Sequence, residues 1–199
     1  MRSLTSLGLV RTVLAAAVIG LALAGCSSPS VPAFDLTAPG PGSRGGGFSG
    51  GQLVVAEPTS IQPLEDQRIL ARDAAGSVSY IGGAQWADRL PRLIQTRMIQ
   101  TFENASRIRT VSRPGEGVTA DYQLNTEIRA FQLDAARGEA FVSLSVKLVD
   151  AKAGRIVNAR VFSSRLPVPD ASGAAVAQVL DRALSTVLLD IVRWAGPRR

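Results

Sequence analysis

Three consecutive segments of alternating apolar and polar residues constrain the fold of this 199-residue chain most strongly. The clearest is residues 139–150, because apolar residues at every second position predict a strand with one buried face. Residues 122–133 and 157–166 alternate similarly, with changes of phase before Phe131 and at Phe162; the first suggests a β-bulge. Short links that end in Gly138 and Gly154 join the segments, as in hairpins, so we expect an antiparallel meander.

Two other segments show the spacing of amphipathic helices. The first begins near Trp86 and continues to Ala105, with Pro91 in its first turn, where a missing N–H is tolerated. The second is predicted from about Ser172 to Ala195, capped by Asp170 or Ser172 and ended by Gly196-Pro197. The predicted apolar stripe of the first helix is Trp86, Leu90, Leu93, Ile94, Met98, Phe102 and Ala105, and its predicted solvent face is Arg89, Arg92, Gln95, Thr96 and Gln100.

Shorter strands are expected at residues 53–57, 69–72, 78–81 and 109–111, with a tight turn at Gly82-Gly83 between the third strand and the first helix. Strands, helix, strands and helix in this order predict an α+β fold. We expect a mainly antiparallel or mixed sheet with two long helices packed on one face. The folded domain is placed at residues 52–196, followed by a short tail, 197–199.

The first 26 residues have the pattern of a bacterial lipoprotein precursor. Arg2 and Arg11 precede an apolar run that is too short to span a bilayer but is typical of a signal peptide. Small residues then lead to Cys26, so we expect cleavage of residues 1–25 and acylation of Cys26. An ordinary secretory signal with a chance cysteine is the alternative. Ser27 follows in place of aspartate, which favours the outer membrane by analogy with lipoprotein sorting.

Residues 26–51 are predicted to be a flexible tether, because they are rich in proline, glycine and serine. Fully extended, the 27 residues from Cys26 to Leu53 would reach about 90 Å. We therefore expect a domain that works well away from the membrane that holds its lipid.

The composition excludes several kinds of catalysis. The chain has no histidine and one cysteine, which removes Cys–His and Ser–His–Asp nucleophiles and the usual zinc sites. Ser145 and Lys147 share a strand face that we expect to be exposed, where the pair would not be activated. The net charge is +6, and Arg2 and Arg11 would leave with the predicted signal peptide. The remaining basic excess suits anionic lipid headgroups or an acidic partner better than nucleic acid, with an ordinary solvated surface as the alternative. We expect no catalytic residue, metal or cofactor.

A few large side chains fall out of phase with the predicted core stripes. They either pack under loops or form a contact patch for a protein or an acyl chain, and the sequence leaves both options open. These side chains are Ile99, Phe131, Phe162, Leu166, Val192 and Trp194.

Several short fragments resemble one family in their order and spacing. They are Arg68-Ile69-Leu70, Tyr80, Trp86–Pro91, Phe102-Glu103-Asn104, Asp121–Leu124, Leu148-Val149-Asp150 and Gly154–Val157, followed by the terminal helix. Residues 53–195 are similar to the ABC-type transport auxiliary lipoproteins, the group that includes paraquat-inducible protein C. The resemblance implies a periplasm-facing lipoprotein that works beside an ABC transporter and an MCE-type substrate-binding protein in lipid transport. It also implies the option of homo-oligomers, and it offers no catalytic motif.

We therefore predict a non-enzymatic outer-membrane lipoprotein, held by palmitate or similar acyl chains, that serves an MCE-type lipid transport system. A lipopolysaccharide-assembly or Tol-like accessory lipoprotein is one alternative. A carboxylate-based periplasmic hydrolase is another, and it would need two converging carboxylates with a shifted pKa. The residues expected to contribute to the partner surface are Trp86, Arg89, Arg92 and Trp194.

Overall fold

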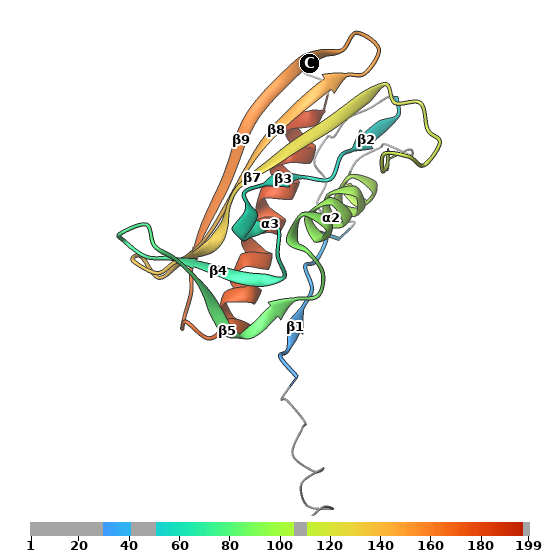
Figure 1. Ribbon diagram of the computed structural model, residues 1–199. Helices are drawn as coiled ribbons and strands as arrows, with labels where there is room; N and C mark the ends of the chain where they lie inside the picture. Colours follow the sequence, from blue (N-terminus) through green and yellow to red (C-terminus); the bar gives the residue numbers. More distant parts are fainter. Residues whose placement is uncertain (1–29, 41–50, 106–110, 197–199) are drawn as a thin grey trace, which may run out of the picture. The chain divides into compact units, whose positions relative to one another are not determined.

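The computed structural model describes residues 30–40, 51–105 and 111–196, with nine strands and two α-helices among them (Figure 1). The predicted signal peptide, Cys26 and the predicted tail, residues 197–199, lie outside these ranges. In chain order the elements are β1 (Ala33–Phe34), β2 (Leu53–Val55), β3 (Thr59–Ser60), the 3-10 helix η1 (Gln62–Leu64), β4 (Arg68–Arg72), β5 (Val78–Trp86), α2 (Leu90–Ala105), β6 (Val111–Ser112), β7 (Tyr122–Asp134), β8 (Glu139–Asp150), β9 (Arg155–Pro167) and α3 (Gly173–Ala195).

The antiparallel meander is confirmed. β8 pairs with β7 on one side and with β9 on the other over its whole length. The register of β7 shifts at Arg129, which is the β-bulge that the phase change before Phe131 predicts. In β9 the expectation was wrong: Phe162 faces the core opposite Leu144, whereas Val157 and Val161 are exposed. The apolar alternation of β9 therefore marks its outward side.

The rest of the sheet is mixed, which confirms the predicted α+β class. β2, β3 and β4 run parallel to β7, while β5 runs antiparallel to β4. Both helices pack on the same face. Thr126 Oγ1 lies 3.9 Å from Met98 Sδ of α2, and Phe162 packs edge-on against Trp194 of α3, with ring centroids 5.4 Å apart. The strand register places Thr126 and Phe162 on one side of the sheet.

Trp86 and the glycine pair before it lie in a strand, where we expected a turn and a helix start. β5 continues through Gly82-Gly83 to Trp86, and α2 begins only at Leu90. Trp86 is 1% exposed and packs edge-on against Phe131. Gly83 has a positive φ of 72°, so the strand passes this point with a conformation that glycine tolerates.

Most of the out-of-phase side chains belong to the core. Ile99, Phe131, Phe162 and Val192 are all buried, and Trp194 and Leu166 are partly buried against the core. Gln95 is also buried, although we expected it on the solvent face of α2. Its side-chain amide donates to the carbonyl oxygen of Val55 at 3.0 Å, so a polar residue joins α2 to β2 inside the domain.

Part of the predicted tether belongs to the fold. β1 adds to β5 as a parallel strand, with Phe34 opposite Trp86, and Leu36 is 1% exposed. Asp35 pairs with Arg97 of α2, and the backbone N–H of Thr37 donates to Asp181 of α3 at 2.7 Å. We call residues 32–40 the strap. The linker prediction is wrong for the strap, and residues 41–50 lie outside the described ranges.

The start of α3 lies unusually close to β5. A Cβ added at Gly173 would lie well inside van der Waals contact with the Cβ of Ala84 and 3.3 Å from the carbonyl oxygen of Gly82. Ser172 caps the helix by accepting from the N–H of Ala175. Glycine at position 173 therefore allows a close approach of helix to strand.

We expect Gly173→Ala to destabilise the domain by about 1–3 kcal/mol, because overpacking outweighs the higher helix propensity of alanine. Gly82→Ala is the matched control, since nothing lies within 4 Å of its added Cβ. Chemical denaturation measures both variants. Adding Ala84→Gly to Gly173→Ala should restore most of the loss, and a neutral Gly173→Ala would contradict the close approach.

A candidate partner-binding surface

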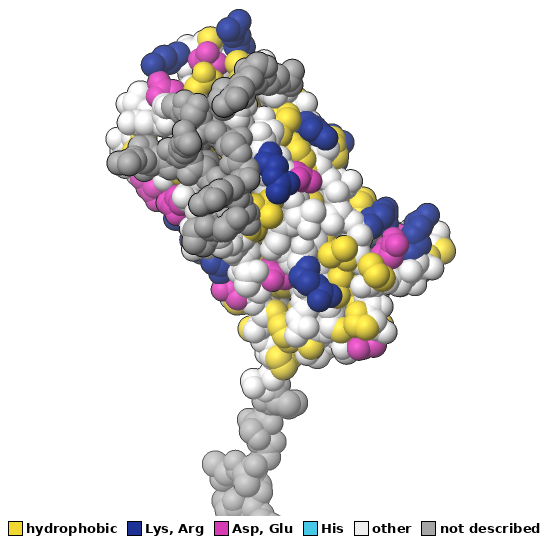
Figure 2. Space-filling model, turned by 180° about the vertical axis from the view of Figure 1, so that it is seen from behind, with side chains coloured by type: hydrophobic (Ala, Val, Ile, Leu, Met, Phe, Trp, Pro, Cys, Tyr) yellow, Lys and Arg dark blue, Asp and Glu magenta, His cyan; other side chains and the backbone are white. Residues whose placement is uncertain are grey.

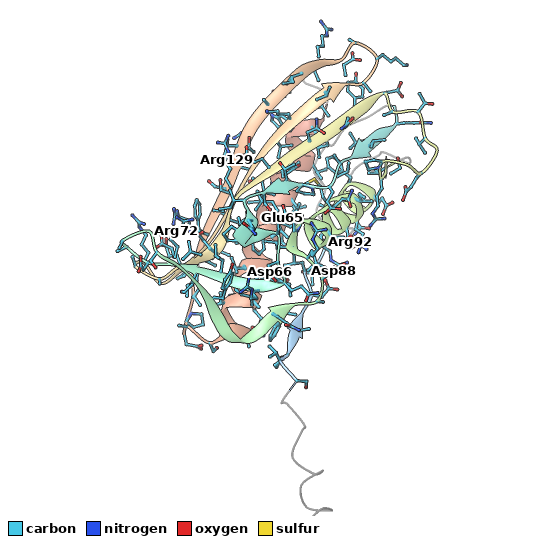
Figure 3. All side chains as sticks on the ribbon, in the orientation of Figure 1. Glu65, Asp66, Arg72, Asp88, Arg92 and Arg129 are labelled. Atoms are coloured by element: carbon cyan, nitrogen blue, oxygen red, sulfur yellow. The ribbon has the colours of Figure 1, made fainter. Side chains whose placement is uncertain are left out.

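A polar hollow of about 620 Å³ opens between η1, the edges of β4 and β5, and the segment just before α2. Glu65 and Asp66 line it from the η1–β4 connection (Figure 3). Arg89, the residue before α2, lines it as well. The remaining lining residues are Gln62, Pro63, Gln67, Arg68 and Tyr80. The hollow exists because β4 and the start of α2 are held together by backbone bonds, such as Leu90 N–H to the Asp66 carbonyl at 3.3 Å.

Ion pairs organise the charges of this hollow. Arg89 Nη2 lies 2.7 Å from Glu65 Oε2 and 3.4 Å from Glu57 Oε1. The Arg68 guanidinium stacks over the Tyr80 ring, 3.7 Å from its centroid. Such stacking fixes a planar guanidinium at a surface. The hollow therefore presents positioned charges of both signs.

Both carboxyl groups in the hollow have lowered pKa values. The Ser60 hydroxyl donates to Glu65 Oε1 at 2.6 Å, and this bond, together with Arg89, lowers the pKa of Glu65. Arg68 Nε donates to Asp66 Oδ2 at 2.6 Å, which lowers the pKa of Asp66. A general acid needs the opposite shift, so that it stays protonated near neutral pH. Glu65 and Asp66 both line the hollow, and neither has the raised pKa of a general acid.

The four residues predicted for the partner surface do not form one patch. Arg89 and Arg92 are exposed at the start of α2, where Arg92 Nη1 lies 3.6 Å from Asp88 Oδ2 (Figure 3). Trp86 is in the core, so the prediction that it contributes to the partner surface is wrong. Trp194 is half-buried against Phe162 of β9, away from the residues that Arg89 contacts.

A second hollow, of about 480 Å³, collects four arginines that the sequence analysis did not single out: Arg72, Arg129, Arg137 and Arg165. Asp134 binds Arg137 and Arg165, at 2.9 and 3.1 Å, and Arg165 stacks 3.6 Å from the ring centroid of Phe141. Arg72 has no acidic partner within the described residues, and its Nε donates to Gln132 at 3.4 Å. These residues meet because β4 pairs with β7 beside the bulge at Arg129. The pairing joins segments that are far apart in the sequence, so the local sequence pattern does not reveal this hollow.

Ser145 and Lys147 line a smaller hollow, of about 330 Å³, together with Glu127 and Asn125. Ser145 is buried, contrary to our expectation of an exposed face, and Lys147 is exposed. Within the ranges that the structure describes, no hydrogen bond joins the two side chains. The pair therefore lacks the contact that an activated nucleophile needs.

The edge of the sheet at β9 is open. Among the described strands β9 pairs only with β8, which leaves the backbone groups along one side of a 13-residue strand unpaired by other strands. Ile156, Val157 and Val161 are exposed along it. Its charged residues are Arg155, Arg160 and Arg165, with no acidic residue. This edge is basic and apolar, as an interaction surface for an acidic partner would be.

The described residues contain neither a metal-binding cluster nor a helix that could span a membrane. No group of three or more histidine, cysteine, aspartate or glutamate side chains is arranged to hold a metal ion there. No helix in those ranges is long and apolar enough to cross a membrane.

The family model for the ABC-type transport auxiliary lipoprotein component matches residues 34–192, which include both helices and β1 to β9 almost entirely. The chain belongs to this family. The resemblance stated from sequence fragments is therefore confirmed, and the match begins inside the strap, eighteen residues before the predicted domain boundary at residue 52.

Relatives of this auxiliary lipoprotein are consistent with that assignment. An uncharacterized protein of Bradyrhizobium diazoefficiens is 32% identical over 147 residues, covering 71% of this chain but 38% of that protein. The crystal structure of protein XCC0632 from Xanthomonas campestris has a TM-score of 0.70 at 28% identity, covering 82% of this chain and 92% of that one. A second uncharacterized protein shares the fold, with a TM-score of 0.65 at 14% identity, covering 83% and 98%.

We expect Ser60→Ala to raise the pKa of Glu65 toward the ordinary value of 4.5, because the Ser60 hydroxyl is the largest single cause of the lowering, and we expect Arg89→Gln to raise it as well. Arg92→Gln should leave that pKa unchanged, since Arg92 contacts Asp88 instead. Carboxyl-carbon NMR titration measures the shifts. A lowered folded-state pKa adds stability above the pKa of unfolded glutamate and loses it as the pH falls, so Ser60→Ala should flatten the acid side of the stability curve.

Proposed function

We propose that this chain is a non-enzymatic accessory lipoprotein of an MCE-type ABC transport system that carries lipids across the periplasm. The observation that carries the proposal is the family match over nearly the whole folded domain. The lipoprotein pattern that ends at Cys26 supports an acyl anchor, and Ser27 supports the outer membrane. The lowered pKa values of Glu65 and Asp66 are consistent with a role in binding rather than hydrolysis.

The partner in this proposal is the MCE-type substrate-binding protein together with its permease. Arg89 and Arg92 at the start of α2 offer exposed cations to an acidic surface, and Arg92 has the weaker internal partner of the two. Homo-oligomers are an option for the same domain. A lipopolysaccharide-assembly or Tol-like role uses the same anchor with different partners, so the identity of the partner discriminates between them.

We expect Cys26→Ser to abolish incorporation of labelled palmitate and to leave residues 1–25 uncleaved, because the predicted lipoprotein processing depends on this cysteine. Two or three acyl chains give stable anchoring, so the variant loses that anchor. Ser28→Ala is the control and should retain both the label and the processing. Unchanged palmitate incorporation by the Cys26→Ser protein would contradict acylation at Cys26, and sucrose-gradient separation of inner and outer membranes for the unaltered protein tests the location.

Crosslinking in intact cells, followed by purification of the acylated protein and mass spectrometry, should recover an MCE-type protein and its permease. Recovery of lipopolysaccharide-assembly or Tol proteins in their place would transfer the proposal to that alternative. Recovery of the chain alone would contradict a partner-dependent role.

Charge reversal tests the proposed contact at α2. Arg92→Glu should lower the crosslinking yield several-fold, and the loss should be larger at low ionic strength, because exposed charges act mainly on association. Arg182→Glu is the matched control, since it reverses an exposed arginine on α3. Equal yields from the two variants would exclude the start of α2 as the contact.

A further inference from the structure

The strap sets how far the domain can move from its lipid. The N–H of Gln85 donates to the Pro32 carbonyl at 3.0 Å, and the N–H of Ala87 donates to the Phe34 carbonyl at 2.8 Å. Leu36 is buried in the core between these bonds and the contacts to α2 and α3. The chain is therefore fixed to the domain from Pro32 onward, and only residues 27–31 separate this point from Cys26.

That short segment limits the distance from the bilayer. Six residue spacings at about 3.3–3.6 Å each allow at most about 20 Å between the Cα atoms of Cys26 and Pro32. If the strap were part of the tether, the reach from Cys26 to Leu53 would be about 90 Å. With Cys26 acylated, as the proposed function requires, Pro32 stays close to the lipid headgroups.

The strap also determines which end of the domain faces the lipid. β1 runs parallel to β5 with Ala33 opposite Gln85, so the chain leaves beside the residues that precede Gln85 in β5, Gly82 to Ala84. α3 starts at the same place, because Gly173 approaches Ala84 and the Gly82 carbonyl. β1, the end of β5 and the start of α3 lie together at the lower end of the domain in Figure 1.

The chemistry of this end suits a headgroup surface. The exposed residues of the β5 and α3 segments here are Gly82, Gly83, Asp170, Ala171, Ser172 and Ala174, and the exposed residues of the chain beside them are Val31, Pro32 and Ala33. Among these residues only Asp170 is charged. Hydrophobic side chains also gather at this end in the rear view (Figure 2). Small, mostly uncharged residues can approach a bilayer without removing water from many ionic groups.

We infer that the end formed by Gly82-Gly83 and residues 170–174 faces the phospholipid bilayer, and that the strap holds it there. The opposite end of the long strands, at the β8–β9 turn, then points away from the bilayer. The register of β8 and β9 puts Ala153 about twelve residues, or about 40 Å, along the strands from Pro167. This inference rests on the proposed acylation of Cys26.

Single-cysteine labelling tests this orientation in the full-length acylated protein. Cys26 is the only cysteine of the chain and its thiol is consumed by acylation, so an introduced cysteine is the only free thiol. The membrane-facing variants are Gly82→Cys and Ala171→Cys, and the matched control is Ala153→Cys, all at exposed positions. Each carries a fluorophore in phosphatidylethanolamine–phosphatidylglycerol vesicles with or without nitroxide-labelled headgroups.

We expect quenching at positions 82 and 171 to be several-fold stronger than at position 153. Insertion of about 20 Gly-Ser residues between Ser28 and Pro29 should make the quenching at the three positions similar, because a longer tether no longer keeps Pro32 near the bilayer. Equal quenching at all three positions with the native tether, or unchanged quenching after the insertion, would overturn the inference.

Flotation of the same vesicles separates the two proposals. If the protein does not float with the lipid, the acyl anchor and hence the proposed function fails. If it floats and the three positions are quenched equally, the anchor stands and only the orientation fails.

Discussion

The pairing register of β7, β8 and β9 is the constraint on which the rest of the structure depends. A slip of one residue would turn Leu124, Leu144 and the residues in line with them away from both helices. The bulge at Arg129 lets Phe131 face the core after Ile128, so Trp86 finds an aromatic partner. The same bulge places Arg129 beside Arg72 at the arginine-lined hollow. Core packing and surface charge thus follow from one irregularity.

The elements predicted correctly from sequence are those in which the apolar repeat continues over the full length of the strand or helix. β8 alternates over twelve residues between two hairpin links, and the stripe of α3 fills a long segment, so local pattern and tertiary structure coincide. β1 is a two-residue strand whose hydrogen bonds go to β5, about fifty residues away. A two-residue strand is too short to show an alternating apolar pattern. The proline and glycine around it therefore led to the prediction of a linker.

The side chains that were misplaced share a physical reason, which is that a neighbour distant in sequence decides their environment. Gln95 is polar at a position that β2 covers, and the Val55 carbonyl satisfies its amide. Trp86 has helical spacing to α2 but belongs to the strand before it, because glycine tolerates the strand geometry at Gly83. Of the predicted partner surface, Arg89 and Arg92 could be recognised as exposed, whereas their pairing with Glu57, Glu65 and Asp88 required the fold.

The strap changes how an anchor and a domain combine. A long flexible tether gives reach but leaves orientation free. A chain fixed at Pro32, with Cys26 acylated as proposed, would exchange reach for a defined approach to the membrane. Backbone bonds to β5, the burial of Leu36 and contacts to both helices hold the strap at several independent points, so losing one exposed contact, such as Thr37 to Asp181, would not release it. In the proposed arrangement, an accessory protein held in this way would present the same surfaces to its partner in every copy, so recognition would not have to offset the entropy of a freely tumbling domain.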